Sequence, residues 1–304
     1  MIFVSEQESA AIASHELAFE AVRAALIAAS KPGAHSFPVV LGNASDPQNR
    51  FTVKSSTDER VTGLKVGSYF PTNDAKSLPR HNSITLLFDQ TEGRIGAIVE
   101  GGKLNAYRTA AADAVATDAL ARKDAAVLAL FGTGHQAGYE AAAVARIRTL
   151  QRVLVVGRDA AKTDRFVSLL REKGLPAERA DAEAACRAAD IIVTATTAAA
   201  ALFKAEWVRA GCHISSMGSD RTGKQELPPE LFTAARLFCD LPEQSRRIGE
   251  FQHAVAGADL TAIGEVLDGR AAGRTGADDI TIFDSSGISL QDLYMAEAVI
   301  RLRG

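Results

Sequence analysis

The chain has 304 residues, 47% of them hydrophobic, and its 34 Lys and Arg against 37 Asp and Glu give a formal net charge of −3 at pH 7. The length suffices for two domains with cores, whereas the near-neutral charge and the lack of a basic stripe argue against nucleic-acid binding. No apolar run is long enough to cross a membrane and the N-terminus has no signal-peptide pattern, so we expect a cytoplasmic protein without a membrane partner. Three widely spaced cysteines (Cys186, Cys212, Cys239) and six scattered histidines predict buried thiols and no metal site.

Residues 1–112 have the pattern of an α+β domain. A helical pattern over Glu6–Ala29 is followed by segments in which apolar and polar residues alternate, as they do in half-buried strands. The expected strands cover residues 50–54, 63–70, 83–88 and 94–99. Alternation of this kind is typical of an antiparallel or mixed sheet with one buried face.

The next feature along the chain is a glycine-rich turn between a strand and a helix. The apolar run Ala125–Phe131 ends at this turn, and an alanine-rich helical pattern covers Glu140–Ile147. Two glycines give the tight turn and the close backbone approach that a pyrophosphate needs, and the helix N-terminus offers unpaired N–H groups. The turn predicted to bind the dinucleotide consists of Gly132, Thr133, Gly134, His135, Gln136 and Ala137.

From this turn onward, strand and helix patterns alternate, which predicts a doubly wound parallel sheet covered by helices on both faces. The expected strands cover 152–157, 177–180, 190–195, 212–217, 236–240 and 280–284, with a clear helix at 162–173. The spacing of Ser289 and Asp292 is that of a capping box and predicts the start of a C-terminal helix, which we expect to return to the first domain.

The end of the second strand bears on the choice of cofactor. An acidic residue at this position usually bonds the ribose 2′-hydroxyl of NAD, but here Gly157 is followed by Arg158. A guanidinium after a small residue suits the 2′-phosphate of NADP, which therefore is favoured over NAD. The alternative is that Arg158 is a solvated loop residue and Asp159 contacts the ribose.

Three charged residues are candidates for chemistry on a substrate. Asp220 follows an expected strand in Met217-Gly218-Ser219-Asp220, at the sheet edge where ligands of open α/β sheets bind, and could exchange a proton with a substrate nitrogen. Lys65 lies in an alternating strand, and Arg108 precedes the segment that leads to the glycine-rich turn. Together these two cations could bind a carboxylate, whereas separately each would be an ordinary surface charge and Asp220 a turn residue.

With these motifs in place, the chain resembles the ornithine cyclodeaminase/μ-crystallin family over nearly its whole length. The segments that carry the resemblance are 63–65, 107–111, 116–122, 132–137, 190–196, 211–220, 224–227, 248–250 and 280–287. The resemblance implies a Rossmann-type doubly wound parallel sheet plus an α+β substrate and dimerisation domain built from both chain ends. The expected domains are residues 113–289 for the dinucleotide, and residues 1–112 with 290–304 for substrate binding in a homodimer.

The resemblance also implies roles for individual residues. Family members move hydride between NAD(P) and the α-carbon of an amino or imino acid, and by motif position Asp220 matches the acid/base while Lys65 and Arg108 match the ligands of the substrate carboxylate. Besides the glycine-rich turn and Arg158, the residues expected to bind the cofactor are Thr109, Thr196, Met217, Gly218 and Ser286.

Two positions depart from the family pattern. A further carboxylate-binding Arg usually follows a proline near the N-terminus, but here Pro38 is followed by Val39 and Val40. Either Arg50 or Arg80 substitutes for it, or the substrate differs. Relatives that use ornithine also tend to carry an acidic residue and a methionine on the strand before the lysine, where this chain has Thr52 and Lys54.

The sequence therefore favours an NAD(P)-dependent oxidoreductase that acts on the C–N bond of a small amino or cyclic imino acid, such as a ketimine or pyrroline-2-carboxylate. One alternative is a cyclodeaminase that converts ornithine to proline and ammonia with a recycled cofactor. The other is an NADPH-binding protein without turnover, which the missing arginine would suit and the presence of Asp220, Lys65 and Arg108 would not.

Overall fold

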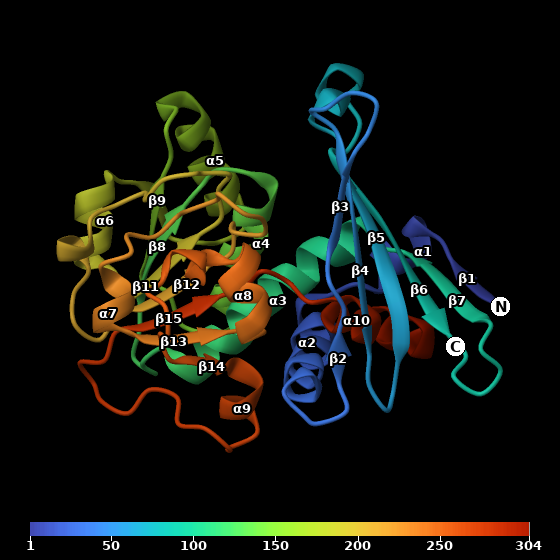
Figure 1. The fold of residues 1–304 in the computed structure, drawn as a ribbon. Helices are drawn as coiled ribbons and strands as arrows, with labels where there is room; N and C mark the ends of the chain where they lie inside the picture. The colour runs from blue at the N-terminus through green and yellow to red at the C-terminus, as the bar shows by residue number, and fades with distance from the viewer. Residues whose placement is uncertain (304) are drawn as a thin grey trace. The chain divides into compact units, whose positions relative to one another are not determined.

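The computed structural model describes residues 1–303. The chain divides into two compact units: one consists of Met1–Arg108 and the chain from Ile288 onward, and the other of Thr109–Gly287 (Figure 1). Both chain ends thus contribute to the first unit. The functional assignment of the units, and with it the expected boundaries at residues 112 and 290, stays a prediction.

The first unit is built on a seven-stranded mixed sheet. Its order is β1-β7-β6-β5-β4-β2, with β3 also paired to β4. β1 runs parallel to β7, and the other pairs are antiparallel. The strands are β1 (Ile2–Val4), β2 (His35–Ser36), β3 (Val40–Asn43), β4 (Arg50–Thr57), β5 (Thr62–Tyr69), β6 (His81–Phe88) and β7 (Ile95–Glu100), with the 3₁₀ helix η1 (Pro71–Lys76) between β5 and β6.

The expected helix over Glu6–Ala29 is wrong in one respect, because the chain forms two helices there, α1 (Glu6–Ile12) and α2 (His15–Ala29). Ala13 is extended, with φ −61° and ψ 128°, and ends the first helix. The Ser14 hydroxyl then accepts a hydrogen bond from the backbone N–H of Leu17 at 3.1 Å and so caps the second. An apolar periodicity that runs through both helices conceals this break.

The C-terminal helix α10 (Ser289–Leu302) belongs to the first unit and packs against α2 and strands β4, β5 and β6 (Figure 1). The predicted capping box is wrong. Ile288 is the N-cap residue and no side chain caps the helix. The Ser289 hydroxyl hydrogen-bonds the Ser56 hydroxyl, and the Asp292 carboxylate accepts a hydrogen bond from Lys65. Both side chains therefore bind the sheet instead of the helix end.

The second unit contains an eight-stranded, entirely parallel sheet with the order β10-β9-β8-β11-β12-β15-β13-β14. The strands are β8 (Val127–Phe131), β9 (Arg152–Val156), β10 (Ala177–Arg179), β11 (Ile191–Thr194), β12 (His213–Ser216), β13 (Arg236–Cys239), β14 (Leu260–Ala262) and β15 (Thr281–Asp284). This confirms the doubly wound parallel sheet, since the chain reverses direction across the sheet at β8, between β9 and β11. The short β14 was not expected.

Helices cover this sheet. The helices of the second unit are α4 (His135–Ile147), α5 (Ala160–Glu172), α6 (Ala182–Ala188), α7 (Leu231–Ala234), α8 (Pro242–Ile248) and α9 (Ile263–Leu267), with 3₁₀ helices η2 (Ala205–Trp207) and η3 (Glu250–His253). Helix α3 (Gly102–Leu120) begins in the first unit, and its residues from Thr109 onward belong to the second. The fully buried strand β11 and large side chains such as Phe251 and Phe283 form the core. The three cysteines are buried free thiols, as expected.

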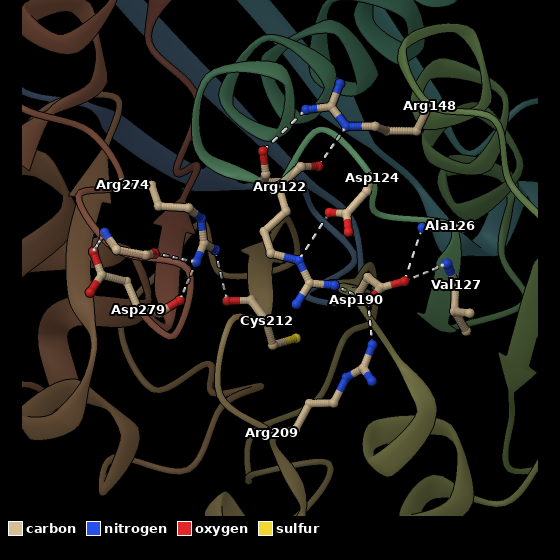
Figure 2. A network of polar contacts seen from close by, with 12 residues as sticks. Arg122, Asp124, Ala126, Val127, Arg148, Asp190, Arg209, Cys212, Arg274 and Asp279 are labelled. Carbon is tan, nitrogen blue, oxygen red and sulfur yellow. Dashed lines mark hydrogen bonds and ion pairs between the residues drawn. The ribbon is translucent and has the colours of Figure 1, made fainter.

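A network of ion pairs and hydrogen bonds around the buried carboxylate of Asp190 joins the amino ends of the parallel strands (Figure 2). The Asp190 carboxylate precedes β11 and accepts hydrogen bonds from the backbone N–H groups of Ala126 and Val127, at 2.9 and 3.0 Å. It also forms ion pairs with Arg122, at 2.6 Å, and with Arg209. Ligands of open α/β sheets bind at the opposite, carboxyl edge of the sheet. The position of this network therefore suits a role in stabilising the fold and not in binding a ligand.

No helix within residues 1–303 combines the length and apolar character that a membrane span requires. The same residues contain no group of three or more His, Cys, Asp or Glu side chains arranged to hold a metal ion.

Candidate active site

The glycine-rich turn follows β8 and leads into α4, as the sequence predicts. Gly132 has φ +120°, and a Cβ there would lie 2.7 Å from the backbone oxygen of Ala195. Gly134 is the N-cap residue of α4, and a Cβ there would meet no atom within 4 Å. Ala137 is fully buried on the first turn of the helix. The helix N-terminus is therefore open to an anion and lacks a side-chain cap of its own.

The other turn residues differ in what they offer a ligand. His135 is exposed and its ring lies 5.0 Å from that of Tyr139. The Gln136 amide donates to the carboxylate of Glu140 at 2.7 Å, which holds it along the helix. Thr133 would be 2.8 Å from a Cβ at position 157, so the turns after β8 and β9 lie against one another.

The loop after β9 is shaped by Gly157, because a Cβ there would also overlap the hydroxyl of Thr163. Arg158 is exposed next to it. Asp159 is the N-cap residue of α5, and its carboxylate accepts a hydrogen bond from the backbone N–H of Lys162 at 2.8 Å. Of the two residues considered for the ribose end of the cofactor, Asp159 already serves the helix and Arg158 faces solvent.

Glu226, which the sequence does not single out, fixes the carboxyl ends of β11 and β12. Its carboxylate accepts hydrogen bonds from the backbone N–H and the hydroxyl of Thr196, both at 2.7 Å, and from the backbone N–H of Gly218 at 2.8 Å. Burial is the largest influence on its pKa, which is raised despite these hydrogen bonds. A side chain at Gly218 would overlap the Thr196 backbone oxygen, so this packing requires glycine.

Glu250 provides a second buried acceptor beside Glu226. It binds the backbone N–H groups of Glu226 and Leu227, at 2.9 and 2.7 Å, and the hydroxyls of Ser216 and Ser219. Two buried glutamates thus hold the segment from Ser216 to Ser219, which immediately precedes Asp220.

Asp220 itself is more exposed than the residues that hold its loop, with 59% of its side chain accessible. Its carboxylate lies 2.8 Å from the ammonium of Lys224, which also donates to the backbone oxygen of Gly218 at 2.6 Å. The loop therefore presents an accessible carboxylate with a cationic partner. This is suitable for proton exchange with a ligand.

The loop after β15 carries Ser286, another predicted cofactor ligand. The Asp240 carboxylate accepts hydrogen bonds from the Gly287 backbone N–H at 2.7 Å and from the Ser286 hydroxyl at 3.3 Å, while the Gln244 amide donates to Ser286 at 2.8 Å. Ser286 is buried and held from both sides. Thr109 on α3 is partly exposed, and Met217 is buried after β12.

In the first unit, Lys65 and Arg108 converge on one carboxylate, that of Asp292. The Lys65 ammonium lies 2.8 Å from Asp292 Oδ1, and Arg108 Nε lies 3.1 Å from the same oxygen. Both cations also donate to the side-chain oxygen of Asn105, and Arg108 donates to that of Gln291 at 3.3 Å. The structure thus brings together the two cations that the sequence proposes for a carboxylate.

Burial sets the protonation of this cluster. It lowers the pKa of Lys65 to about 7, partly offset by the charge of Asp292, and Arg108 and Lys54 lower it further. Burial would raise the pKa of Asp292, but Arg108 and Lys65 outweigh it and hold that pKa below its ordinary value. Asp292 stays ionised and keeps two cations in place, one of which titrates near neutral pH.

The sequence did not indicate that Asp292, Asn105 or Gln291 belongs to this site, and it assigned Asp292 to a helix cap. The one available indication was Lys65 itself, because a lysine on the buried face of a strand needs a counterion. Of the two arginines considered as substitutes near the N-terminus, Arg80 pairs with Asp74 on the surface. Arg50 stacks on the ring of Tyr69, 4.9 Å from its centre.

The fold and these residues define a class of protein: a doubly wound parallel α/β unit of the kind found in NAD-binding dehydrogenases, combined with an α+β unit in which two buried cations contact one carboxylate. The model of the ornithine cyclodeaminase/mu-crystallin family matches residues 3–301. The chain belongs to this family.

Individual relatives agree with this assignment. The chain is 38% identical to the iminosuccinate reductase of Paracoccus denitrificans, over 99% of this chain and 96% of that one, and the structure of that enzyme with NAD+ superposes with a TM-score of 0.93. An archaeal alanine dehydrogenase dimer with bound NAD is 30% identical, covers 99% of this chain and 95% of its own, and has a TM-score of 0.91. The Δ1-pyrroline-2-carboxylate reductase of Thermococcus litoralis with NADH and L-proline is 26% identical, covers 99% and 97%, and has a TM-score of 0.89.

Proposed function

We propose that this chain is an NAD(P)H-dependent reductase of α-imino acids, which converts the C=N bond of the substrate into the C–N bond of an amino acid. The observation that carries the proposal is the convergence of Lys65 and Arg108 on the carboxylate of Asp292. A buried site with two cations and one acidic side chain has a net positive charge, which can bind the carboxylate of a ligand. The similarity to reductases of iminosuccinate and of pyrroline-2-carboxylate supports the reaction type.

A dinucleotide held at the turn formed by Gly132 and Gly134 would supply the hydride for reduction of the imine carbon. Lys65 and Arg108 bind the substrate carboxylate and orient the carbon that accepts the hydride. Asp220, in its protonated form, gives a proton to the imine nitrogen, so that one imine, one NAD(P)H and one proton give one amine and one NAD(P)+. Glu226 and Glu250 hold the loop of Asp220 in position.

The test is a comparison of substrates with purified protein. Consumption of NADPH or NADH is followed with imines formed from oxaloacetate or pyruvate and ammonia, and with Δ1-pyrroline-2-carboxylate. Ammonia release from ornithine without net cofactor turnover would instead support a cyclodeaminase. Binding of NADPH without turnover of any of these compounds would leave only a binding role.

The variant Asp220→Asn tests the proposed role of Asp220 as proton donor. It keeps the size of the side chain and removes the proton-donating acid, so turnover should fall at least about a hundredfold while NADPH affinity stays within about threefold. Retention of more than about a tenth of the activity would remove Asp220 from the proposed role.

For the cofactor, we propose a preference for NADP over NAD. Arg158 is exposed beside Gly157, and Asp159 caps α5. The relatives whose structures hold NAD+ or NADH make NAD the alternative. The ratio of kcat/KM for NADPH and NADH decides, and Arg158→Ser should lower that ratio about tenfold or more. A preference of the unmodified protein for NADH above about tenfold would overturn the proposal.

We also propose a homodimer formed by the first unit. The outward face of its sheet carries directly paired apolar residues, Val53 opposite Val66 and Val66 opposite Ile84, and Val66 and Ile84 are 38% and 39% exposed. A second copy of the chain would bury this face, as the dimeric alanine dehydrogenase suggests. Ile84→Glu should give monomers in sedimentation, whereas Leu169→Glu, at an exposed site on α5, should not. An unmodified protein that sediments as a monomer would refute the proposal.

A further inference from the structure

The inner face of strands β4, β5 and β6 carries an unusual block of polar residues. Directly paired residues in an antiparallel sheet share a face, and so do alternate residues along each strand. Three rows of paired residues therefore share this face: Lys54–Lys65–Thr85, Thr52–Gly67–Ser83 and Arg50–Tyr69–His81. Farther along the strands the same face is occupied by buried Ser56, Gly63 and Leu87, which belong to the interior under α10.

Gly67 lies at the centre of this block. A Cβ at this position would be 3.4 Å from the Thr52 hydroxyl, 3.7 Å from His81 Nε2 and 3.7 Å from Lys65 Cε. The glycine therefore leaves this position of the face without a side chain, next to the Thr52 hydroxyl, the His81 imidazole and the end of the Lys65 side chain. A small polar ligand fits the chemistry of this surface better than an apolar one.

The charges on this face are mostly positive. Lys54 is paired with Lys65 across the two strands. Burial is the largest influence on the pKa of both Lys65 and Asp292, followed by the charges of closer neighbours, and the charge of Lys54 makes a smaller contribution that lowers both pKa values. Two cations, Lys65 and Arg108, contact the carboxylate of Asp292, and Lys54 lies directly across the strand pair from Lys65. Two cations suffice for one substrate carboxylate, and Lys54 adds a third positive charge to the same face of the sheet.

We infer that the substrate of this site is an imino dicarboxylate, with Lys65 and Arg108 binding the carboxylate next to the imine carbon and Lys54 binding the distal carboxylate. The inference rests on the proposed function and adds the substrate class to it. A distal ammonium, as in ornithine, would meet a like charge at Lys54, which disfavours a diamino acid. The 38% identity to an iminosuccinate reductase agrees with a dicarboxylate.

The test compares two imines that differ by the distal carboxylate, one formed from oxaloacetate and ammonia and the other from pyruvate and ammonia. The unmodified enzyme should prefer the dicarboxylate by about a hundredfold in kcat/KM, because a charge-assisted contact is gained. Lys54→Met should reduce this preference about 10- to 100-fold, mainly through KM, and Lys54→Arg should retain most of it. Lys76→Met removes an exposed lysine from η1 and is the matched control, with no change in preference.

The outcomes separate the inference from the proposed function. Turnover of the pyruvate-derived imine without a preference for the dicarboxylate overturns the inference and leaves imine reduction standing. A preference that Lys54→Met does not alter, in a variant with unchanged NADPH affinity and melting temperature, also overturns it. Turnover of neither imine, nor of pyrroline-2-carboxylate, removes the proposed function and the inference together.

Discussion

The protonation of Lys65 gives a quantitative prediction about ligand binding. Its side chain is 7% exposed, and burial lowers its pKa from 10.5 to about 7. Only the ammonium form binds a carboxylate, so above this pKa the free protein must take up a proton before or while it binds. Affinity for a carboxylate ligand should then fall about tenfold for each pH unit above the pKa, which amounts to about a hundredfold at pH 9.

The assay is calorimetric titration of the NADPH-loaded protein with succinate or pyrrole-2-carboxylate, whose carboxylates stay ionised between about pH 6.5 and 9. The matched variant is Lys65→Arg, because a guanidinium stays charged throughout this range. Its affinity should be nearly independent of pH, even if it is weaker at pH 7. An unmodified protein with constant affinity over the range, or a Lys65→Arg variant with the same slope, would refute the reasoning.

The same shift has a consequence for stability, whose sign is fixed by linkage. The folded pKa of about 7 lies below the unfolded value of 10.5, so between these values the unfolded chain binds more protons at this site than the folded chain does. The contribution of Lys65 to the free energy of unfolding therefore rises as the pH rises from about 7 towards 10.5. Lys65→Met should remove this part of the pH dependence in denaturant titrations of the ligand-free protein.

Three further predictions concern the second unit. Gly132→Ala places a Cβ 2.7 Å from the Ala195 backbone oxygen at φ +120°, so NADPH affinity measured by fluorescence should fall at least about tenfold; an unchanged affinity would contradict the assigned role of the turn. Glu226→Gln replaces one carboxylate oxygen by an NH2 group, which donates and cannot accept, so one of the N–H donors loses its acceptor. We expect kcat to fall about 10- to 100-fold, with a loss of about 1–3 kcal/mol in unfolding free energy. Asp190→Ala removes the carboxylate at the centre of the ion-pair network at the amino edge of the sheet, so Tm should fall by about 5–10 °C. NADPH affinity should stay within about threefold, and a large loss of affinity would show that the two edges of the sheet are coupled.

The parallel sheet was predictable because each of its central strands has a recognisable apolar pattern in its own sequence. Runs such as Ile191–Thr194 are apolar throughout, since both faces of the strand are buried, and a helical pattern follows most of them. The strands that sequence reasoning missed, β1, β2, β3 and β14, have only two to four residues. Strands this short are defined by the partner they pair with, and neither pattern nor propensity identifies them.

The error at Asp292 shows how a local pattern can hide a long-range contact. Ser289 and Asp292 have the spacing of a capping box, a motif that satisfies the first N–H groups of a helix. Lys65, a buried lysine 227 positions earlier in the chain, requires a counterion. Leaving this buried ammonium unpaired would cost more free energy than leaving the helix end uncapped. The helix was therefore predicted and the use of its first acidic residue was not.

The loops of the candidate site could be located from sequence, but the groups that hold them could not. Gly132 is recognisable as a tight-turn position and Gly218 as a cofactor residue by motif position, whereas Glu226 and Glu250 lie in segments that match the family but have no role assigned by the sequence. They are buried because several backbone N–H groups and hydroxyls need acceptors where the strands end. Which side chain supplies the acceptor depends on the path of the loop, and that path is not encoded in any local spacing.

The chain lacks the arginine that usually follows Pro38 in this family, and the sequence offered Arg50 and Arg80 as substitutes. The structure treats these two arginines differently. Arg80 cannot replace a missing ligand without giving up Asp74, its partner on the surface. Arg50 lies on the same face as Lys54 and Lys65, next to Tyr69, so the face keeps its positive charge without an arginine after Pro38. If Arg50 does substitute, Arg50→Met should raise KM for both the oxaloacetate- and pyruvate-derived imines, whereas Lys54→Met should raise it for the first alone. A change confined to one imine in both variants would assign Arg50 and Lys54 to the same carboxylate.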